Sequence, residues 1–235
     1  MGKYEVTQEL YAAVMTGQSV TIDGTTYTLY AGQNQGNLPA NNVTWYDAVY
    51  FCNKLTEKVG NLTPAYEISV QTVSSDGHIT YATVTYNQNA NGYRLPTEAE
   101  WEFAFRGGNP LLASWNYLYS GSNSDLDSVG WYNDNSNNTI HEAGSKVANT
   151  LGLCDMSGNV SEWCYDWQAI METGPFTNPV AGSENPDKIS SSVKMMRGGC
   201  YNNSASGCSN YHRDTVFPGT KSNSYGFRLA RSVSN

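Results

Sequence analysis

Four short strings of residues constrain the fold of this chain more than any other feature of its sequence. They are Asn42–Ala48, Gly92–Glu102, Asp155–Trp163 and Gly226–Ala230. The second string holds the strongest helix signal, because Thr97 and Glu100 form a capping box at the start of an apolar run. We expect the tryptophans of such strings to be core residues more often than parts of an aromatic binding groove. These tryptophans are Trp45, Trp101 and Trp163, and the nearby Trp167 is considered with them.

The other local signals predict short regular elements separated by long irregular stretches. A helix is predicted from about Gln8 to Met15, with Leu10 and Val14 facing the core. Thr44 starts another helix, which ends at Gly60. Hairpins are predicted to turn at residues 23–24 and 76–77, both Asp-Gly. The stretches 109–150, 173–192 and 198–224 lack periodicity, and irregular stretches of this length in a compact domain are usually functional or tied down.

The four strings occur in the order found in the formylglycine-generating-enzyme-like (sulfatase-modifying factor) domain, which the chain resembles from about Tyr4 to Arg231. The resemblance implies an α+β domain, a loop-rich variant of the C-type lectin fold with short helices around antiparallel strands. We expect one domain over residues 1–235, with no internal repeat and no linker. The segment Gly2–Thr7 resembles family sequence already under way. We therefore expect that an earlier strand and any export signal or membrane anchor precede Met1.

Composition narrows the possible partners. The formal charge is −8 and the pI about 4.8, whereas a nucleic-acid partner would require a basic face. No apolar run approaches the length of a membrane span. Five cysteines leave at least one unpaired, and no CxxC pair suggests zinc. The histidines, His78, His141 and His212, are too scattered for the three-histidine iron site of the sulfoxide synthases, another branch of the superfamily.

The resemblance also supplies a test for copper-dependent oxidase activity. Oxidase members of the family carry two cysteines, separated by four residues, after an Arg-Gly-Gly. Here Arg197–Gly199 is present, but Asn203 occupies the first cysteine position and Cys208 the second. Cys200 is an additional thiol nearer the glycines. Because Cu(I) prefers two soft ligands, we expect no catalytic site.

A bound cation is the second expectation from the resemblance. The string from Asp155 to Glu162 is similar to the family segment that wraps a calcium ion. There, side-chain oxygens at the Asp155 and Glu162 positions join backbone carbonyls at the Gly158 and Val160 positions, and calcium prefers such oxygen ligands. The alternative is that Asp155 and Asn159 only brace the turn. We expect no required cofactor and consider calcium as the one candidate.

The segment from Cys200 to Tyr225 is rich in Tyr, Ser, Asn and Gly, the composition of antibody-like binding loops. It resembles the C-terminal variable segment of proteins diversified by retroelements, in which random replacement of template adenines excludes Lys, Glu, Gln, Met and Trp. Lys221 is the only excluded residue here, and Arg213, Pro218 and Lys221 would be fixed. We predict a variable segment at about 197–228. The expected ligand-binding residues are Tyr201, Asn202, Ser204, Ser206, Tyr211, His212, Asp214, Thr215, Val216, Phe217, Thr220, Ser222, Ser224 and Tyr225.

The sequence thus favours a non-catalytic ligand-binding protein, receptor-like or adhesin-like, with a hypervariable site. We expect a cell-surface or extracellular location, a protein or other surface ligand, no nucleic acid, and membrane contact only through an anchor outside this sequence. Two alternatives stay open: a copper-dependent formylglycine-generating oxidase acting on a protein cysteine, and an inactive scaffold domain without a variable surface.

Overall fold

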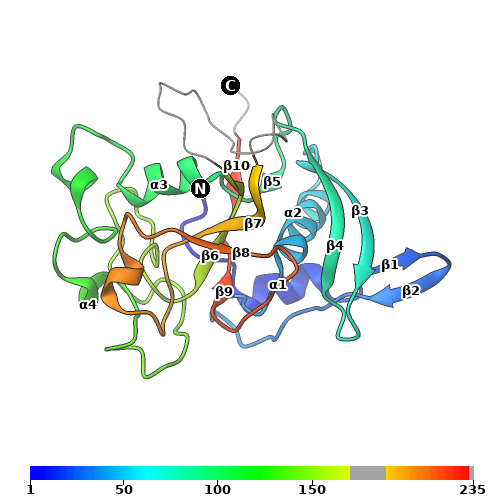
Figure 1. The fold of residues 1–235 in the computed structure, drawn as a ribbon, viewed down its shortest axis with the longest axis horizontal. Coiled ribbons are helices and arrows are strands. Elements are labelled where there is room, and N and C mark those ends of the chain that lie inside the picture. Colours follow the sequence, from blue (N-terminus) through cyan, green and yellow to red (C-terminus); the bar gives the residue numbers. More distant parts are fainter. Residues whose placement is uncertain (170–188, 233–235) are drawn as a thin grey trace.

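The computed structural model describes residues 1–169 and 189–232 of the chain (Figure 1). Short helices surround short, mostly antiparallel strands, as the sequence predicts. The helices are α1 Gln8–Met15, α2 Trp45–Val59, α3 Glu98–Phe105, α4 Leu126–Val129, and the 3₁₀ turns η1 Ala113–Asn116 and η3 Ala205–Cys208. The strands are β1 Ser19–Ile22, β2 Thr25–Thr28, β3 Tyr66–Val73, β4 Ile79–Tyr86, β5 Tyr93–Arg94, β6 Ser161–Ala169, β7 Ile189–Arg197, β8 Asp214–Val216, β9 Tyr225–Gly226 and β10 Ala230–Arg231.

The helices begin where side chains can bond to the free backbone N–H groups of the first turn. Thr44 and Thr97 each accept a hydrogen bond three residues into the helix, and Asp47 and Glu100 return one, so both helices carry a complete capping box. The side chain of Thr7 caps α1 by accepting a hydrogen bond from Leu10 N, without the second bond of a capping box. The sequence predictions for these helix starts are therefore confirmed.

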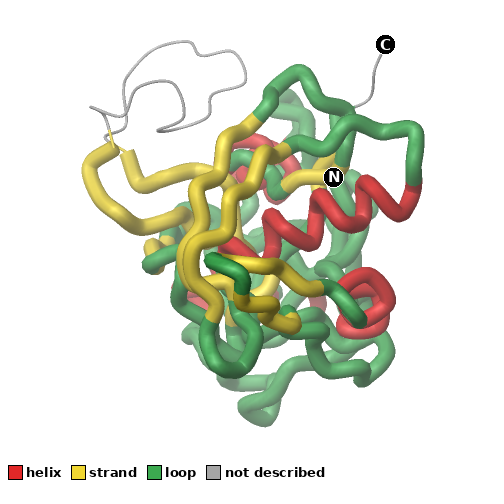
Figure 2. The backbone as a smooth tube through the Cα atoms, turned by 90° about the vertical axis from the view of Figure 1, so that its right-hand side faces the viewer, coloured by secondary structure: helices red, strands yellow, loops and turns green. Residues whose placement is uncertain are grey.

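A four-stranded sheet in the order β8-β7-β6-β9 organises the C-terminal half. Strand β6 pairs antiparallel with β7, with Glu162 opposite Arg197, and parallel with β9, with Glu162 opposite Gly226. The remaining strands form three two-stranded pairs: the β1–β2 and β3–β4 hairpins and the β5–β10 pair. The β1–β2 hairpin projects from the body, whereas β3–β4 lies along α2 (Figures 1 and 2).

The largest apolar cluster joins α1, α2, the β3–β4 hairpin and the inner face of β6. Trp45, Trp101 and Trp163 are at most 2% exposed, which confirms them as core residues, while Trp167 is only partly buried. On α1 the core-facing prediction is right for Val14 and wrong for Leu10, which is 37% exposed. Tyr11 takes the central position instead, stacked on Phe51 with ring centroids 5.2 Å apart.

Two fully buried charged residues connect the ends of the chain to this core. Arg228 donates from Nε and Nη2 to the two carboxylate oxygens of Glu162, at 2.7 and 2.6 Å, and from Nη1 to the carbonyl of Gly2. Trp101 Nε1 donates to the same carboxylate at 2.7 Å. Strand β6, α3 and both terminal segments therefore meet at one ion pair. Among the described residues, no helix has the length and apolar character needed to cross a membrane.

Candidate recognition surface

The segment expected to be variable lies between β7 and β10 and crosses one side of the molecule, where Figure 1 shows it in orange to red. We call residues 200–225 the recognition segment. It contains η3, the edge strand β8 and the first residue of β9, joined by irregular turns. The segment begins after β7 and ends in β9, and both strands belong to the same sheet. It is therefore a loop presented by a rigid scaffold, and such loops commonly carry recognition.

The start of the recognition segment is held by backbone geometry. Gly198 and Gly199 have positive φ values of 92° and 66°, and a Cβ at Gly199 would lie 2.3 Å from the carbonyl oxygen of Gly207. Only glycine fits both the conformation and this close approach. Tyr201 N then donates to the carbonyl of the buried Asn159 at 2.8 Å, which fixes the direction of the chain.

Two arginines hold the middle of the segment against α3. The buried Arg197 donates to the carbonyls of Asn210 and His212, at 2.9 and 2.7 Å, and to the carboxylate of Glu102 at 2.9 Å. Arg213 forms a two-pronged ion pair with Glu98, at 2.6 and 2.7 Å. Because guanidinium groups bind carbonyls and carboxylates in fixed directions, these contacts hold the backbone from 210 to 213 without using the exposed side chain of Tyr211.

The last part is bonded to the N-terminal half of the molecule. Trp45 N donates to the carbonyl of Pro218 at 3.0 Å, and Asn42 N to that of Ser222 at 2.9 Å. Lys221, the residue incompatible with diversification, is paired with Asp76 at the tip of the β3–β4 hairpin. The three residues expected to be fixed, Arg213, Pro218 and Lys221, thus all make contacts that attach the segment to the scaffold.

Most of the fourteen residues expected to bind ligand lie at the surface. Phe217 and Tyr211 are the most prominent, with 61% and 67% of their side chains exposed. The prediction of exposure is wrong for Ser224, which is 8% exposed and bonded to Ser222 Oγ at 2.9 Å. The exposed members are Asn202, Ser204, Ser206, Tyr211, Asp214, Phe217 and Thr220; the partly exposed members are Tyr201, His212, Thr215, Val216, Ser222 and Tyr225.

The thiols of the recognition segment are poorly placed for metal or redox chemistry. Cys208 is fully buried, and burial raises its pKa to about 12. Burial also raises the pKa of Cys200, which is 4% exposed and contacts the side-chain oxygens of Asn202 and Asn203 at 3.0 and 3.1 Å. Asn203 also accepts a bond from Cys200 N and so braces the turn. Thiolates are the form that binds copper, and these surroundings disfavour them.

The residues expected to bind calcium do not present a free set of oxygen ligands. Both oxygens of Glu162 are occupied by Arg228 and Trp101, and the buried guanidinium would repel a divalent cation. Asp155 Oδ2 accepts a bond from Gly144 N at 2.6 Å, while its buried Oδ1 lacks a hydrogen-bond partner. Burial raises the pKa of Asp155 to about 6. No group of three or more His, Cys, Asp or Glu with metal-binding geometry occurs in the described part of the chain.

Gly158 and Val160 serve the turn in other ways. A Cβ at Gly158 would lie 2.1 Å from the carbonyl oxygen of Trp131, and Val160 N donates to Glu5 Oε1 at 3.1 Å. Asn159 braces the turn, since its amide bonds to Glu5 and His141. These contacts agree with the bracing alternative, and calcium at this site stays a prediction from the resemblance.

Sequence reasoning missed a loop that supports the recognition segment. Asn133 N donates to the carbonyl of Asn203 at 3.0 Å, and Ser136 Oγ to that of Tyr201 at 2.7 Å. His141 is part of this loop: its ring stacks on Trp131 at 3.7 Å, and its Nε2 bonds to the carbonyl of Ser136. The loop's high Asn content was the only sequence signal, and composition alone does not reveal a contact with a segment 70 residues away.

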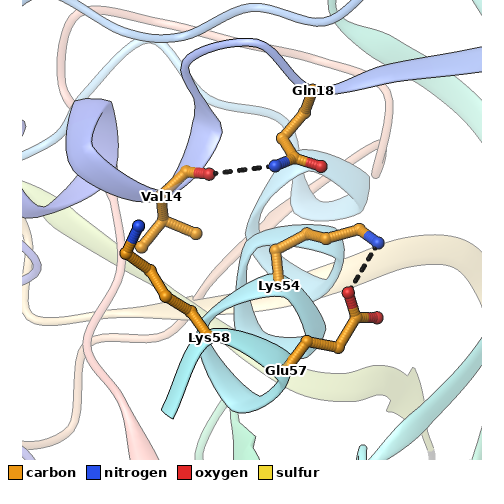
Figure 3. A pocket seen from close by; sticks show the side chains of 5 residues that line it. All are labelled: Val14, Gln18, Lys54, Glu57 and Lys58. Atoms are coloured by element: carbon orange, nitrogen blue, oxygen red, sulfur yellow. Dashed lines mark hydrogen bonds and ion pairs between the residues drawn. The ribbon is translucent and has the colours of Figure 1, made fainter. Parts of the chain in front are cut away.

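A shallow cleft lies between α1 and α2, at the residues drawn in Figure 3. It is lined by Val14, Gln18, Lys54, Glu57 and Lys58, and the Lys54–Glu57 ion pair of 2.8 Å closes one side. None of the residues expected to bind ligand or metal lines it.

Comparison with known proteins identifies the family. Residues 1–233 match the sulfatase-modifying factor enzyme 1-like domain. The chain belongs to this family. Its structure is similar to that of Treponema denticola variable protein 1, with a TM-score of 0.74 and 37% identity, over 97% of this chain and 82% of that one. The predicted family, α+β fold and likeness to a variable protein are thus confirmed.

Two sequence relatives show how far the similarity reaches. Chaperone protein LppX of Paenibacillus barcinonensis is 40% identical over 191 residues, or 74% of this chain and 64% of that protein. The formylglycine-generating enzyme of Streptomyces coelicolor is 31% identical over 167 residues, or 66% and 52% of the two chains. The chain therefore spans less than two thirds of the length of these relatives.

Proposed function

We propose that this domain is a non-catalytic ligand-binding module whose recognition segment is diversified by a retroelement. The observation that carries the proposal is that different atoms of residues 200–225 hold the segment in place and face the solvent. Backbone atoms and a few fixed side chains are bound to the scaffold, whereas seven of the fourteen side chains expected to vary are exposed and only Ser224 is buried. Val216 and Tyr225 are exceptions, because they pack against the core. Random replacement is tolerated only where a side chain does not pack, because the loss of buried groups destabilises a protein by roughly 1 kcal/mol or more.

Similarity to a variable protein supports the same reading, since that protein shares both the family fold and 37% of aligned residues. The exposed Tyr211 and Phe217 would serve as anchors for a partner, because aromatic side chains dominate binding hot spots. The acidic charge opposes nucleic acid as that partner. A protein or other ligand met at the cell surface fits the proposal.

Oxidase activity is disfavoured by the same geometry. Asn203 replaces one thiol and participates in a turn, and both nearby thiols are buried with raised pKa values. Incubating the domain with copper, oxygen and a sulfatase-type cysteine peptide should yield no aldehyde by mass spectrometry. Turnover would contradict the binding-module proposal.

The decisive experiment replaces the exposed positions together. A library in which residues 202, 204, 206, 211, 214, 217 and 220 vary among Asn, Ser, Tyr, Asp and Thr should keep the thermal midpoint of most members near that of the parent. As a matched control, Gly199→Ala and Arg197→Met should each unfold the domain or lower the midpoint strongly. Widespread unfolding of library members would remove the basis of the proposal. A reverse transcriptase gene beside a near-identical template copy would identify the diversifying element.

A further inference from the structure

Five apolar side chains gather at the surface where α3 ends and the next turn begins. Leu111 is 91% exposed, the highest value of any large apolar side chain in the described residues, and Leu112 is 45% exposed. Phe103 of α3 is 48% exposed and packs edge-on against the partly buried Trp115, with the ring centroids 5.7 Å apart. We call this surface the apolar tip; its residues are Phe103, Leu111, Leu112, Trp115 and Leu151.

Leu151 comes from a distant part of the chain and completes the tip. It is 50% exposed, and a Cβ at Gly108 would lie 2.9 Å from its Cδ1, so Leu151 lies against the backbone of Gly108. The neighbouring Thr150 donates from Oγ1 to the carbonyl of Gly107 at 3.2 Å, which attaches this strand of chain to the end of α3. Contiguous exposed apolar side chains of this kind mark interaction sites more often than single ones do.

Hydrogen bonds hold the tip in this exposed conformation. Asn109 accepts a bond from Leu111 N at its side-chain oxygen and one from Leu112 N at its carbonyl, at 3.0 and 3.1 Å. Trp115 N donates to the carbonyl of Leu112 at 3.0 Å, and Arg106 Nη1 donates to that of Trp115 at 2.9 Å. The two leucines are therefore presented to the solvent by a turn of defined geometry.

The surface around the tip carries no charge of its own. No Asp, Glu, Lys or Arg occurs at 107–124 or at 147–154, although the formal charge of the chain is −8. The cations that flank these stretches are engaged, Arg106 with Glu102 at 2.9 Å and Lys146 with the carbonyl of Asp127. Figure 1 shows η1, which follows the two leucines, at the edge of the molecule. The tip is thus an uncharged, apolar surface on an acidic protein.

This composition fits a lipid bilayer better than a protein partner. Exposure falls from Leu111 and Leu112 to Trp115 and Tyr117, which are partly buried. Leucines followed by Trp and Tyr match a membrane–water interface, where aliphatic side chains reach the acyl chains and aromatic ones stay at the headgroups. Five side chains are also far fewer than the roughly 20–30 residues per side of a stable protein interface.

We propose that the apolar tip inserts into the interfacial layer of a lipid bilayer, and that electrically neutral headgroups suffice for this binding. The driving force is the burial of leucine and aromatic surface, because the flanking cations are already engaged and the acidic chain is repelled by anionic lipids. The inference concerns a surface outside residues 200–225 and goes beyond the proposed function.

The experiment measures partition of the full chain onto sucrose-loaded phosphatidylcholine vesicles, which are sedimented with the bound protein. We expect a partition constant on the order of 10³–10⁴ M⁻¹, no stronger than that of a single acyl chain. It should change by less than about twofold between low and high salt, because no ionic contact is involved. Replacing about a third of the lipid with phosphatidylglycerol should weaken binding or leave it unchanged.

The test variant is Leu111→Asn, Leu112→Asn, and the matched control is Leu10→Asn, Val59→Asn. The control residues are exposed apolar side chains of α1 and α2, at 37% and 52%. We expect the test variant to partition at least ~10-fold more weakly and the control to change by less than about twofold, because only the first pair enters the acyl region. Thermal midpoints close to that of the parent in both variants establish that the fold is kept.

Tryptophan fluorescence reports the depth of insertion. Phosphatidylcholine brominated near the headgroup should quench part of the emission of the parent, and Trp115→Phe should remove most of this quenching, because Trp45, Trp101 and Trp163 are buried in the core. Absence of vesicle binding by the parent, binding that requires anionic lipid, or equal losses in the test and control variants would each overturn the inference. So would concentration-dependent dimers that dissociate in the test variant while vesicles stay unbound, since the tip would then contact a second copy of the chain.

Discussion

The buried Glu162–Arg228 ion pair joins β6 to α3 and to both terminal segments of the chain. Both side chains are fully buried, so each charge is separated from water and is stabilised mainly by the other. Arg228 also binds the carbonyls of Gly2 and Cys154, which joins the N-terminal segment to β6. Breaking one partner of such a pair leaves a buried, uncompensated charge, and this loss is larger than the net worth of the pair.

We therefore predict that Arg228→Met lowers the free energy of unfolding by about 3–5 kcal/mol. The double variant Arg228→Met, Glu162→Gln should recover part of this loss, because the orphaned carboxylate is removed. Urea unfolding monitored by tryptophan fluorescence gives both values. A loss below about 1 kcal/mol in Arg228→Met would show that the pair is not a structural centre.

The cysteines give a second residue-scale prediction. All five are free and buried, and burial raises the pKa of Cys208 to about 12. Since the thiolate is the reactive form, native protein at pH 8 should react with Ellman's reagent at least ~10²-fold more slowly than urea-unfolded protein. Absorbance at 412 nm follows both reactions. One rapidly reacting thiol in the native protein, mapped to Cys200 by mass spectrometry, would reopen the question of redox chemistry in the recognition segment.

At the scale of single elements, strand β7 contains an unusual buried cation. Lys194 is 1% exposed, and its Nζ lies 3.9 and 3.7 Å from the ring centres of Trp45 and Trp167. Burial lowers its pKa well below the usual value, while Asp166 opposes the shift. The indole faces also favour the charged form, but the desolvation of an ammonium is the larger effect.

Because the pKa of Lys194 is lower in the folded state than in the unfolded state, the free energy of unfolding changes with pH in a definite direction. Between the folded-state pKa of Lys194 and the usual value of 10.5, the unfolded chain binds more protons than the folded one, so stability rises with pH in this window. Urea midpoints should therefore increase from pH 7 to 9 in the parent. Lys194→Met should flatten this increase and stabilise the domain at pH 7 by about 1–3 kcal/mol. A Lys194→Met variant that is destabilised and keeps the slope would show that the aromatic cage outweighs desolvation.

Some helices and strands were predictable from the local sequence, and others were not. The helix starts at Thr44 and Thr97 were predictable because a capping box is a local code. The apolar period of α1 was misleading: Leu10 and Val14 fit it, but the contact with Phe51 places Tyr11 inward. Strands as short as β9 carry no period, since their pairing is set by distant neighbours such as β6. The same holds for α4, whose position depends on packing against η3.

At the scale of the whole molecule, the chain closes on itself around β6. Gly2 N bonds to the carbonyl of Leu229 at 2.6 Å, and Val6 N to that of Phe227 at 2.9 Å, so both terminal segments lie beside each other. The recognition segment leaves the sheet after β7, returns to it as the edge strand β8 beside β7, and ends at β9 on the other side of β6. Its two ends are thus held by the two strands that flank β6.

Calcium binding at Asp155 and Glu162 would involve the same buried ion pair between Glu162 and Arg228. A calcium ion on Asp155 and Glu162 would have to displace the Arg228 guanidinium, which bonds both terminal segments. A ligand that binds only the folded state at 1,000 times its Kd would stabilise it by about 4 kcal/mol, a shift of several degrees. We expect the thermal midpoints in excess EDTA and in 1 mM calcium chloride to agree within about 1 °C. Asp155→Asn, which keeps an acceptor for Gly144 N, should behave identically in both buffers. A higher midpoint in calcium that is lost in Asp155→Asn would establish the family's calcium site here and require Arg228 to move.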